Sequence, residues 1–81
     1  MFINKTAEGR NNRCGEKIAR LRTGMGISQR KLADMLQLNG LDIDKNAIQR
    51  IEAGKRFVTD IELVHFCRLF KVDYKQLLDD E

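Results

Sequence analysis

Apolar residues in the middle of the chain recur at helical spacing, and polar helix-start residues divide them into segments. The most regular stretch is residues 26–54, GISQRKLADMLQLNGLDIDKNAIQRIEAG. Within it, Ser28 can accept a hydrogen bond from an unpaired backbone N–H and so begin a helix. The apolar face of this helix follows at helical spacing: Leu32, Ala33 and Leu36.

A second helix is predicted from Asp44 to Ala53, because Asp44 provides the same kind of N-cap. At about 100° per residue, its apolar and polar side chains separate onto opposite sides. The apolar side consists of Ala47, Ile48 and Ile51. The polar side, which we call the outer face, consists of Lys45, Asn46, Gln49 and Arg50.

The outer face combines two amides with two cations on consecutive turns. Arg or Lys satisfies the two acceptors of guanine, and Asn or Gln pairs bidentately with adenine. A good bidentate pair contributes about 1–3 kcal/mol of discrimination against the wrong base. A solvated helix face explains the same polar stripe equally well. The residues alone therefore leave base contact and solvation as open alternatives.

Another helix is predicted before this pair, from about Asn12 to Arg22, and Gly24 and Gly26 end it. Its expected buried positions follow helical spacing: Cys14, Ile18, Leu21 and Met25.

Two more helices are predicted near the end of the chain. One begins at Thr59, because Thr59 and Glu62 have the spacing of a capping box. Its buried stripe is Leu63, Phe66, Cys67 and Phe70. The last is a short helix through Leu77 and Leu78, in which Asp73 and Gln76 repeat the capping spacing. The sequence has no Pro, no strand-like alternation and no internal repeat, so the predicted class is all-α.

From Gly15 to Leu78 the chain resembles the lambda-repressor and Cro type of helix-turn-helix domain. Four segments carry the resemblance: GEKIARLRTGMGISQRKLA, NAIQRIEAGKR, VTDIELVHFCRLFKVD and YKQLL. The resemblance implies a compact five-helix DNA-binding fold. It also implies that the helix from Asp44 lies in the major groove as the recognition helix and that its outer face contacts base edges.

The turn between the two central helices is longer than the usual tight turn of that family. The extra residues centre on Leu38 to Asp42. Because Leu38, Leu41 and Ile43 are apolar, we expect a loop that packs against the domain. The longer turn affects the docking angle of the recognition helix, above all at its first residues.

Phosphate contacts are expected where basic or amide side chains adjoin helix ends. Gln29 follows the Ser28 cap, where free N–H groups favour an anion, and the resemblance places a backbone-contacting Gln there. Arg30 and Lys31 share that turn, with solvation as an equal alternative. Lys55 and Arg56 follow a glycine helix stop, on a loop that runs beside the DNA backbone in the family.

Arg22 and Glu52 are expected to form a structural ion pair, because similar domains pair a basic residue late in the first helix with an acidic one late in the third. The pair would clamp the recognition helix to the scaffold. Removing one partner costs several kcal/mol only where such a pair is well buried. Two exposed charges would contribute little.

The length of 81 residues permits one domain, which we assign to residues 12–81, preceded by a flexible tail over residues 1–11. The tail is either disordered or an arm that enters the minor groove.

Charge is unevenly distributed along the chain. Twelve of the 15 Lys and Arg residues precede Phe57, as do six of the 12 Asp and Glu residues. A net charge of +3 therefore hides a basic front part, which attracts a phosphate backbone, and an acidic end.

The remaining chemistry excludes several protein classes. No long apolar run or secretory segment is present, so we expect a cytoplasmic protein with no membrane contact. Cys14 and Cys67 are interpreted as buried hydrophobes, because a reducing compartment disfavours a disulfide. His65 and Cys67 point in nearly opposite directions on a helix, so no metal is expected. We predict no cofactor and no enzymatic activity, because no nucleophile and base are paired in the sequence.

The sequence therefore predicts a regulator that binds a specific site in double-stranded DNA. Repression by steric exclusion, as a homodimer on pseudo-palindromic half-sites, is the simplest mechanism for one small domain. The dimer surface is expected on the last two helices, which include Phe70 and Tyr74. An antitoxin or a protein-interaction module with the same fold is the alternative, although the charged outer face argues against the second of these.

Overall fold

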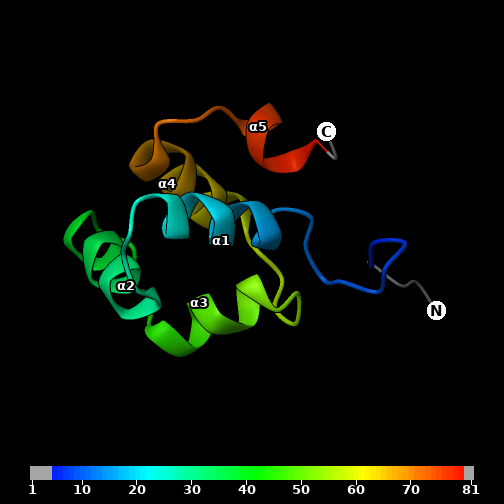
Figure 1. Cartoon of the computed structure of the whole chain (residues 1–81), viewed down its shortest axis with the longest axis horizontal. Helices are drawn as coiled ribbons and strands as arrows, with labels where there is room; N and C mark the ends of the chain where they lie inside the picture. The colour runs from blue at the N-terminus through cyan, green and yellow to red at the C-terminus, as the bar shows by residue number, and fades with distance from the viewer. Residues whose placement is uncertain (1–4, 80–81) are drawn as a thin grey trace.

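The computed structural model describes residues 5–79, which contain five helices and no strand (Figure 1). The all-α class and the five-helix arrangement predicted from the sequence are confirmed. In chain order the helices are α1 (Gly15–Gly24), α2 (Gln29–Leu38), α3 (Lys45–Glu52), α4 (Asp60–Phe70) and α5 (Tyr74–Leu78).

The predicted N-caps form as the sequence indicates. The side chains of Ser28, Asp44, Thr59 and Asp73 each accept a hydrogen bond from the backbone N–H three residues later. At Thr59 and Asp73 the capping box is complete, because Glu62 and Gln76 accept from the cap backbone in return. Four of the five helices therefore begin where a short polar side chain satisfies an otherwise unpaired donor.

The first helix differs from the expected one at both ends. It begins at Gly15, three residues after the predicted Asn12, and its N-cap Cys14 makes no side-chain cap bond. The Asn12 Oδ1 atom instead accepts the Gly15 N–H at 2.8 Å. The expected burial of Met25 is wrong, because 47% of this residue is exposed. Met25 is the C-cap of α1, and Gly26 after it has a positive φ of 72°, at which the chain leaves the helix.

The hydrophobic core lies between the helices and takes residues from all five. The side chains at Ile18, Leu32, Leu36, Ile48, Ile51, Phe66 and Leu77 are completely buried. Phe66 also stacks on the half-buried Phe70, with ring centroids 6.4 Å apart. Cys14 and Cys67 are buried and free, as expected of small hydrophobic residues.

The lengthened turn between α2 and α3 is anchored at its centre and at its end. Gly40 adopts a φ of 92°, and the N–H groups of Gly40 and Leu41 bond to the Gln37 and Leu36 carbonyls. This Schellman arrangement ends α2 and turns Leu41 into the core beside Leu36. Ile43 follows it inward, and both are less than 10% exposed, which confirms a packed loop.

One prediction for this turn is wrong, because Leu38 is 88% exposed. Leu38 is the last residue of α2 and directly follows two residues whose carbonyls close the helix end. Because Leu38 comes two residues after the buried Leu36, it lies on the opposite side of the helix, which faces solvent.

The segment before α1 is not a free tail over the residues that the structure describes. Residues 1–4 lie outside the described part. Thr6 accepts the Arg10 N–H through its hydroxyl at 3.0 Å, and Arg10, Asn11 and Asn12 then bond to the chain at the end of α3. The prediction of a flexible tail therefore needs correction at Arg10 and Asn11, which sequence-distant carbonyls hold, whereas the bond between Thr6 and Arg10 is local.

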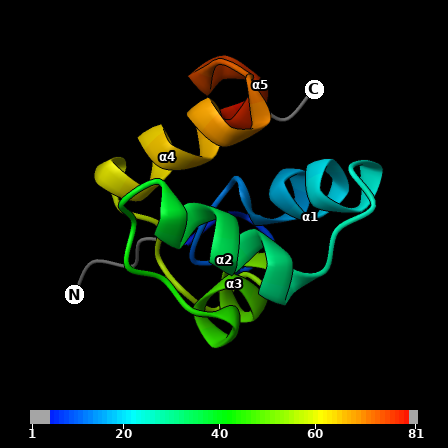
Figure 2. The same cartoon turned by 90° about the vertical axis from the view of Figure 1, so that its left-hand side faces the viewer.

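Helix α3 lies at one side of the molecule and α5 at the opposite side in both views (Figures 1 and 2). Helix α1 lies between them and packs on α3, and α2 packs on both α3 and α4. The outer surface of α3 is thus turned away from the C-terminal helices.

Helix α1 approaches α3 closely at Gly15. A Cβ atom added there would overlap the Ile51 carbonyl oxygen and would lie 2.7 Å from the Asn12 Oδ1 atom. The neighbouring groups are backbone or hydrogen-bonded side chain, so they have little freedom to retreat. Gly24, at the other end of the same helix, has open space around an added Cβ.

These surroundings predict opposite effects of the same substitution. Gly15→Ala should lower the free energy of unfolding by about 1–3 kcal/mol, because the added methyl overpacks the α1–α3 contact. Gly24→Ala should raise it by about 0.5–1 kcal/mol, because alanine restricts the unfolded chain at no steric cost. Urea unfolding of both variants measures the difference, and equal effects of the two would contradict the close approach at Gly15.

Candidate nucleic-acid interface

The outer face of α3 is exposed as the sequence predicted. Lys45, Asn46, Gln49 and Arg50 are all exposed, whereas Ile48 and Ile51 on the opposite side are completely buried. The Asp44 carboxylate fixes the start of α3 by accepting the Ala47 N–H at 2.8 Å. The structure therefore presents two amides and two cations together on one side of a short, capped helix.

Glu52, at the end of α3, forms the predicted ion pair with Arg22. The Arg22 Nε and Nη2 atoms donate to the two carboxylate oxygens at 2.7 and 3.1 Å. The side chains are only 15% and 9% exposed, so the pair is well buried. The Glu52 carboxylate raises the pKa of Arg22 above its ordinary value. Arg22 also donates to the Ile27 carbonyl at 2.9 Å, which ties the pair to the turn before α2.

Gln29, the first residue of α2, joins the same carboxylate. Its Nε2 atom donates to Glu52 Oε1 at 2.9 Å. This contact was not predicted, because the sequence suggested a phosphate partner for Gln29. An amide nitrogen carries two hydrogens, so the bond to Glu52 is compatible with a phosphate contact through the other. Arg30 and Lys31, on the same turn of α2, are exposed.

The loop that leaves α3 begins with the predicted glycine stop. Gly54 has a φ of 78°, and the N–H groups of Gly54 and Lys55 bond to the Ile51 and Arg50 carbonyls at 3.0 and 2.9 Å. This is a Schellman motif, which requires the left-handed conformation that glycine adopts readily. Lys55 is exposed directly after it, beside the end of the outer face.

A family comparison agrees with this geometry. A model of the helix-turn-helix family, of the Cro/C1 (XRE) type, matches residues 18–77, which include α2, α3 and the turn between them. The chain belongs to this helix-turn-helix family. The domain is therefore of the kind that binds double-stranded DNA and regulates transcription. A search among curated proteins gives no match. A search among solved structures gives none either.

Arg56 of this helix-turn-helix domain, for which a phosphate contact was predicted, forms an ion pair within the domain. Its Nη1 and Nη2 atoms each donate to one carboxylate oxygen of Glu62 at 2.8 Å. A bidentate guanidinium–carboxylate pair of this kind is among the stronger polar contacts in proteins. The pair fastens the exit of α3 to the start of α4, so the structure gives Arg56 a scaffold contact that the sequence did not indicate.

Glu62 serves this pair and the α4 cap at once. One of its oxygens also accepts the Thr59 N–H at 3.0 Å. The Arg56 guanidinium, aided by the Thr59 backbone, holds the pKa of Glu62 below its ordinary value of 4.5. The capping-box spacing was visible in the sequence, but the Arg56 partner was not.

The two thiols and the possible metal ligands of the described residues were the remaining candidates for a chemical site. Burial raises the pKa of the Cys14 thiol to about 11, and it raises that of Cys67 as well, so neither thiol is activated. Within residues 5–79, no group of three or more metal-binding side chains comes together. No helix in that range is long and apolar enough to span a membrane.

The buried Arg22–Glu52 pair predicts a large stability effect. Glu52→Gln should lower the free energy of unfolding by about 3 kcal/mol, because it leaves the largely buried Arg22 charge without its counter-charge. The melting temperature should fall by roughly 10 °C or more. Thermal unfolding measures this, with Glu8→Gln as the control, because Glu8 is exposed. An unchanged melting curve for Glu52→Gln would reject the clamp.

The lowered pKa of Glu62 predicts a pH-dependent contribution to stability. A carboxylate whose pKa is lower in the folded state stabilises the fold above its ordinary pKa, and this contribution is lost as the pH falls through the folded-state value. Glu62→Gln should therefore be less stable than the natural chain at pH 7. The difference should shrink as the pH falls from about 4.5 towards 3. Urea unfolding over this pH range measures it, and a constant difference would contradict the role of the carboxylate charge.

Proposed function

We propose that the protein is a transcriptional repressor that occupies an operator in duplex DNA as a homodimer. In this proposal α3 enters the major groove, and the outer face reads the base pairs. The observation that carries it is the combination of four exposed polar side chains with a helix whose last residue is clamped to α1 and α2. A reading element must be both accessible and held in one orientation.

The outer face has the chemistry that base-edge contacts need. Arg50 and Lys45 offer donors that match the two acceptors of guanine, and Asn46 and Gln49 offer the donor and acceptor that match adenine. In helix-turn-helix proteins the N-terminal residues of the recognition helix contact the bases. On that basis Lys45 and Asn46 reach deepest, and Gln49 and Arg50 follow one turn later.

Phosphate contacts on both sides of α3 would fix its register. On one side, Gln29, Arg30 and Lys31 form the first turn of α2, where backbone N–H groups and the helix dipole favour an anion. On the other side, Lys55 stands exposed on the loop that leaves α3. Such contacts contribute affinity for any sequence, and the outer face then adds the preference.

The homodimer is proposed to form through α4 and α5, on the side away from α3. Two large apolar side chains on these helices are exposed, Ile61 at 66% and Tyr74 at 50%. Burial of such side chains is what a stable subunit interface supplies. A two-fold dimer binds two half-sites about one helical turn apart, which predicts a pseudo-palindromic operator.

Selection of binding sites from a random duplex library tests the proposal, because it requires no assumed operator sequence. The purified protein is selected at low salt and at physiological salt. Recovery of a pseudo-palindrome with half-sites about one helical turn apart supports a dimeric operator-binding protein. Enrichment of no sequence, with only salt-sensitive binding left, would contradict the repressor and favour a partner-dependent or protein-interaction role.

Substitutions separate base contacts from phosphate contacts in the same assay. Asn46→Ala and Arg50→Ala should each relax preference at particular positions of the operator, at a cost of about 1–3 kcal/mol for the preferred base. Lys55→Ala should weaken binding to all sequences alike and reduce the salt slope of log K by about 1. Lys75→Ala, on exposed α5 far from α3, is the matched control for the lost charge. Unaltered preference in both outer-face variants would reject the assignment.

A further inference from the structure

Residues 10–12, which we call the strap, lie against the end of the recognition helix. Every one of the three donates to a carbonyl there, across about forty positions of sequence. The five bonds run from Arg10 Nη2 to Glu52 O at 2.8 Å, from Asn11 N to Gly54 O at 2.8 Å, from Asn11 Nδ2 to Lys55 O at 3.1 Å, and from Asn12 Nδ2 to Ile51 O at 3.0 Å and to Arg56 O at 2.8 Å.

The carbonyls of Ile51 and Glu52 belong to the last turn of α3, where a helix end leaves carbonyls without intrahelical partners, and those of Gly54, Lys55 and Arg56 lie on the loop beyond it. The Schellman motif supplies backbone donors for Arg50 and Ile51, whereas the donor for the Glu52 carbonyl is the Arg10 guanidinium. A cation at this end also opposes the partial negative charge of the helix dipole. The strap thus completes the C-terminal end of α3 and continues along the loop that carries Lys55.

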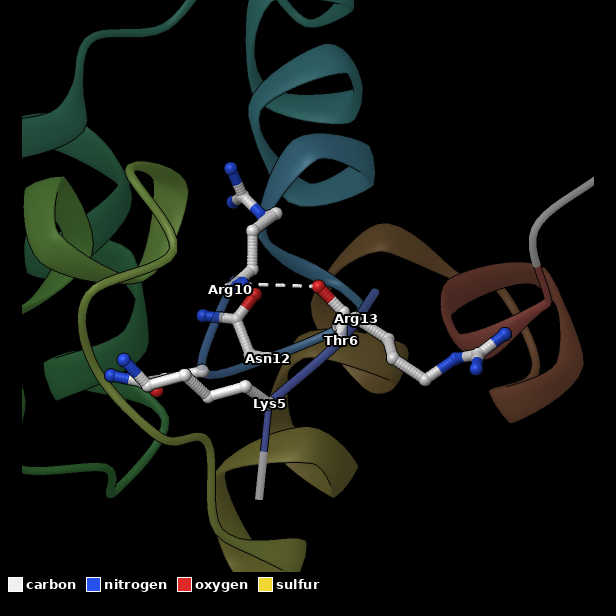
Figure 3. Close-up of a pocket in the computed structure, with 6 residues that line it drawn as sticks. Lys5, Thr6, Arg10, Asn12 and Arg13 are labelled. Atoms are coloured by element: carbon white, nitrogen blue, oxygen red, sulfur yellow. Dashed lines mark hydrogen bonds between the residues drawn. The ribbon is translucent and has the colours of Figure 1, made fainter. Parts of the chain in front are cut away.

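The Asn12 amide connects α1 and α3 in one group. Its oxygen accepts the Gly15 N–H at the start of α1, while its nitrogen donates to the end of α3 and to the loop beyond it. Asn12 is only 8% exposed, so water does not compete for these bonds. Figure 3 shows that Arg13 points toward α5, whereas Asn12 turns its amide nitrogen the other way, toward the chain that leaves α3.

The packing around the strap leaves α3 little room to shift. Arg10 lies directly over Gly54, where an added Cβ would come within 2.7 Å of the guanidinium carbon. An added Cβ at Gly15 would overlap the Ile51 carbonyl oxygen. Both glycines are buried. The strap therefore fits only one position of the last turn of α3.

We propose that Arg10 and Asn12 are positioning residues for DNA recognition. They hold the outer-face side chains of α3 in the orientation in which these meet the bases. They act through these groups and do not touch DNA. The proposal rests on the proposed function for its DNA-binding consequence, while its effect on α3 stands independently of DNA.

Two variants of the full chain test the strap, each with a matched control. Asn12→Ser keeps an oxygen able to cap α1 but loses both donors to the α3 end. Its control is Asn39→Ser, because Asn39 is exposed and makes only a local bond to the Met35 carbonyl. Arg10→Gln removes the donor to Glu52, and Arg20→Gln, on the exposed side of α1, removes the same charge elsewhere.

Amide hydrogen exchange followed by NMR provides the first readout, without DNA. The N–H groups of Ala53, Gly54 and Lys55, which close the end of α3, should exchange at least tenfold faster in Asn12→Ser and Arg10→Gln. Those of α4 should change much less, and the two controls should leave both unchanged. Unchanged exchange at the α3 end would overturn the strap. A uniform increase in all helices would overturn it too, because it would show general destabilisation only.

Binding to the selected operator and to unrelated duplex DNA provides the second readout. Both strap variants should lose about tenfold in the ratio of specific to non-specific affinity, while the salt slope of log K stays that of the natural chain. Equal weakening for all sequences with a slope reduced by about 1 would make Arg10 a phosphate contact and overturn positioning. A natural chain without sequence preference would refute the proposed function, and the exchange measurement would still decide whether the strap holds α3.

Discussion

The carboxylate of Glu52 is the point at which the helices of the DNA-binding unit are joined. It belongs to the last residue of α3, accepts two bonds from Arg22 of α1 and one from Gln29 of α2, and is almost entirely shielded from water. Burying such a pair costs desolvation free energy that its attraction only partly returns. Its benefit is geometric, because a planar guanidinium and a planar carboxylate meet in one arrangement, and apolar side chains of similar volume would not fix the helices so closely.

That geometric benefit matters because the core is small. Twelve apolar residues are buried in the described part of the chain, and they can hold α3 against the domain without specifying its rotation tightly. The polar contacts lie at helix ends, where Asp44 begins α3 and the Schellman motif, Glu52 and the strap complete its end. The apolar contacts therefore hold α3 in place, and the polar contacts at its ends set its orientation.

Most of the fold could be predicted because its signals are local. The caps at Ser28, Asp44, Thr59 and Asp73 and the stop at Gly54 each involve residues within a few positions of one another, so spacing alone was sufficient. The Arg22–Glu52 pair could be predicted only from the family resemblance. The strap and the Arg56–Glu62 pair depend on which backbone carbonyls and carboxylates the folded chain brings near, and nothing in local spacing encodes that. The exposure of Leu38 and Met25 could not be predicted either. Helix periodicity indicates which face of a helix is apolar, but it does not show at which residue the end of the helix leaves the core.

The lengthened turn makes these end contacts more important than they would be in a tight helix-turn-helix. A short turn restricts the angle between its two helices by covalent geometry alone, whereas the six residues from 39 to 44 do not. Here the angle depends on Leu41 and Ile43 in the core, on the bond from Gln37 to the Ile43 carbonyl at 2.7 Å, and on Glu52 at the far end. The start of α3 is thus held by the loop, and its end by Glu52 and the strap. Because neither end alone determines the direction of a helix axis, accurate placement of the outer face requires both.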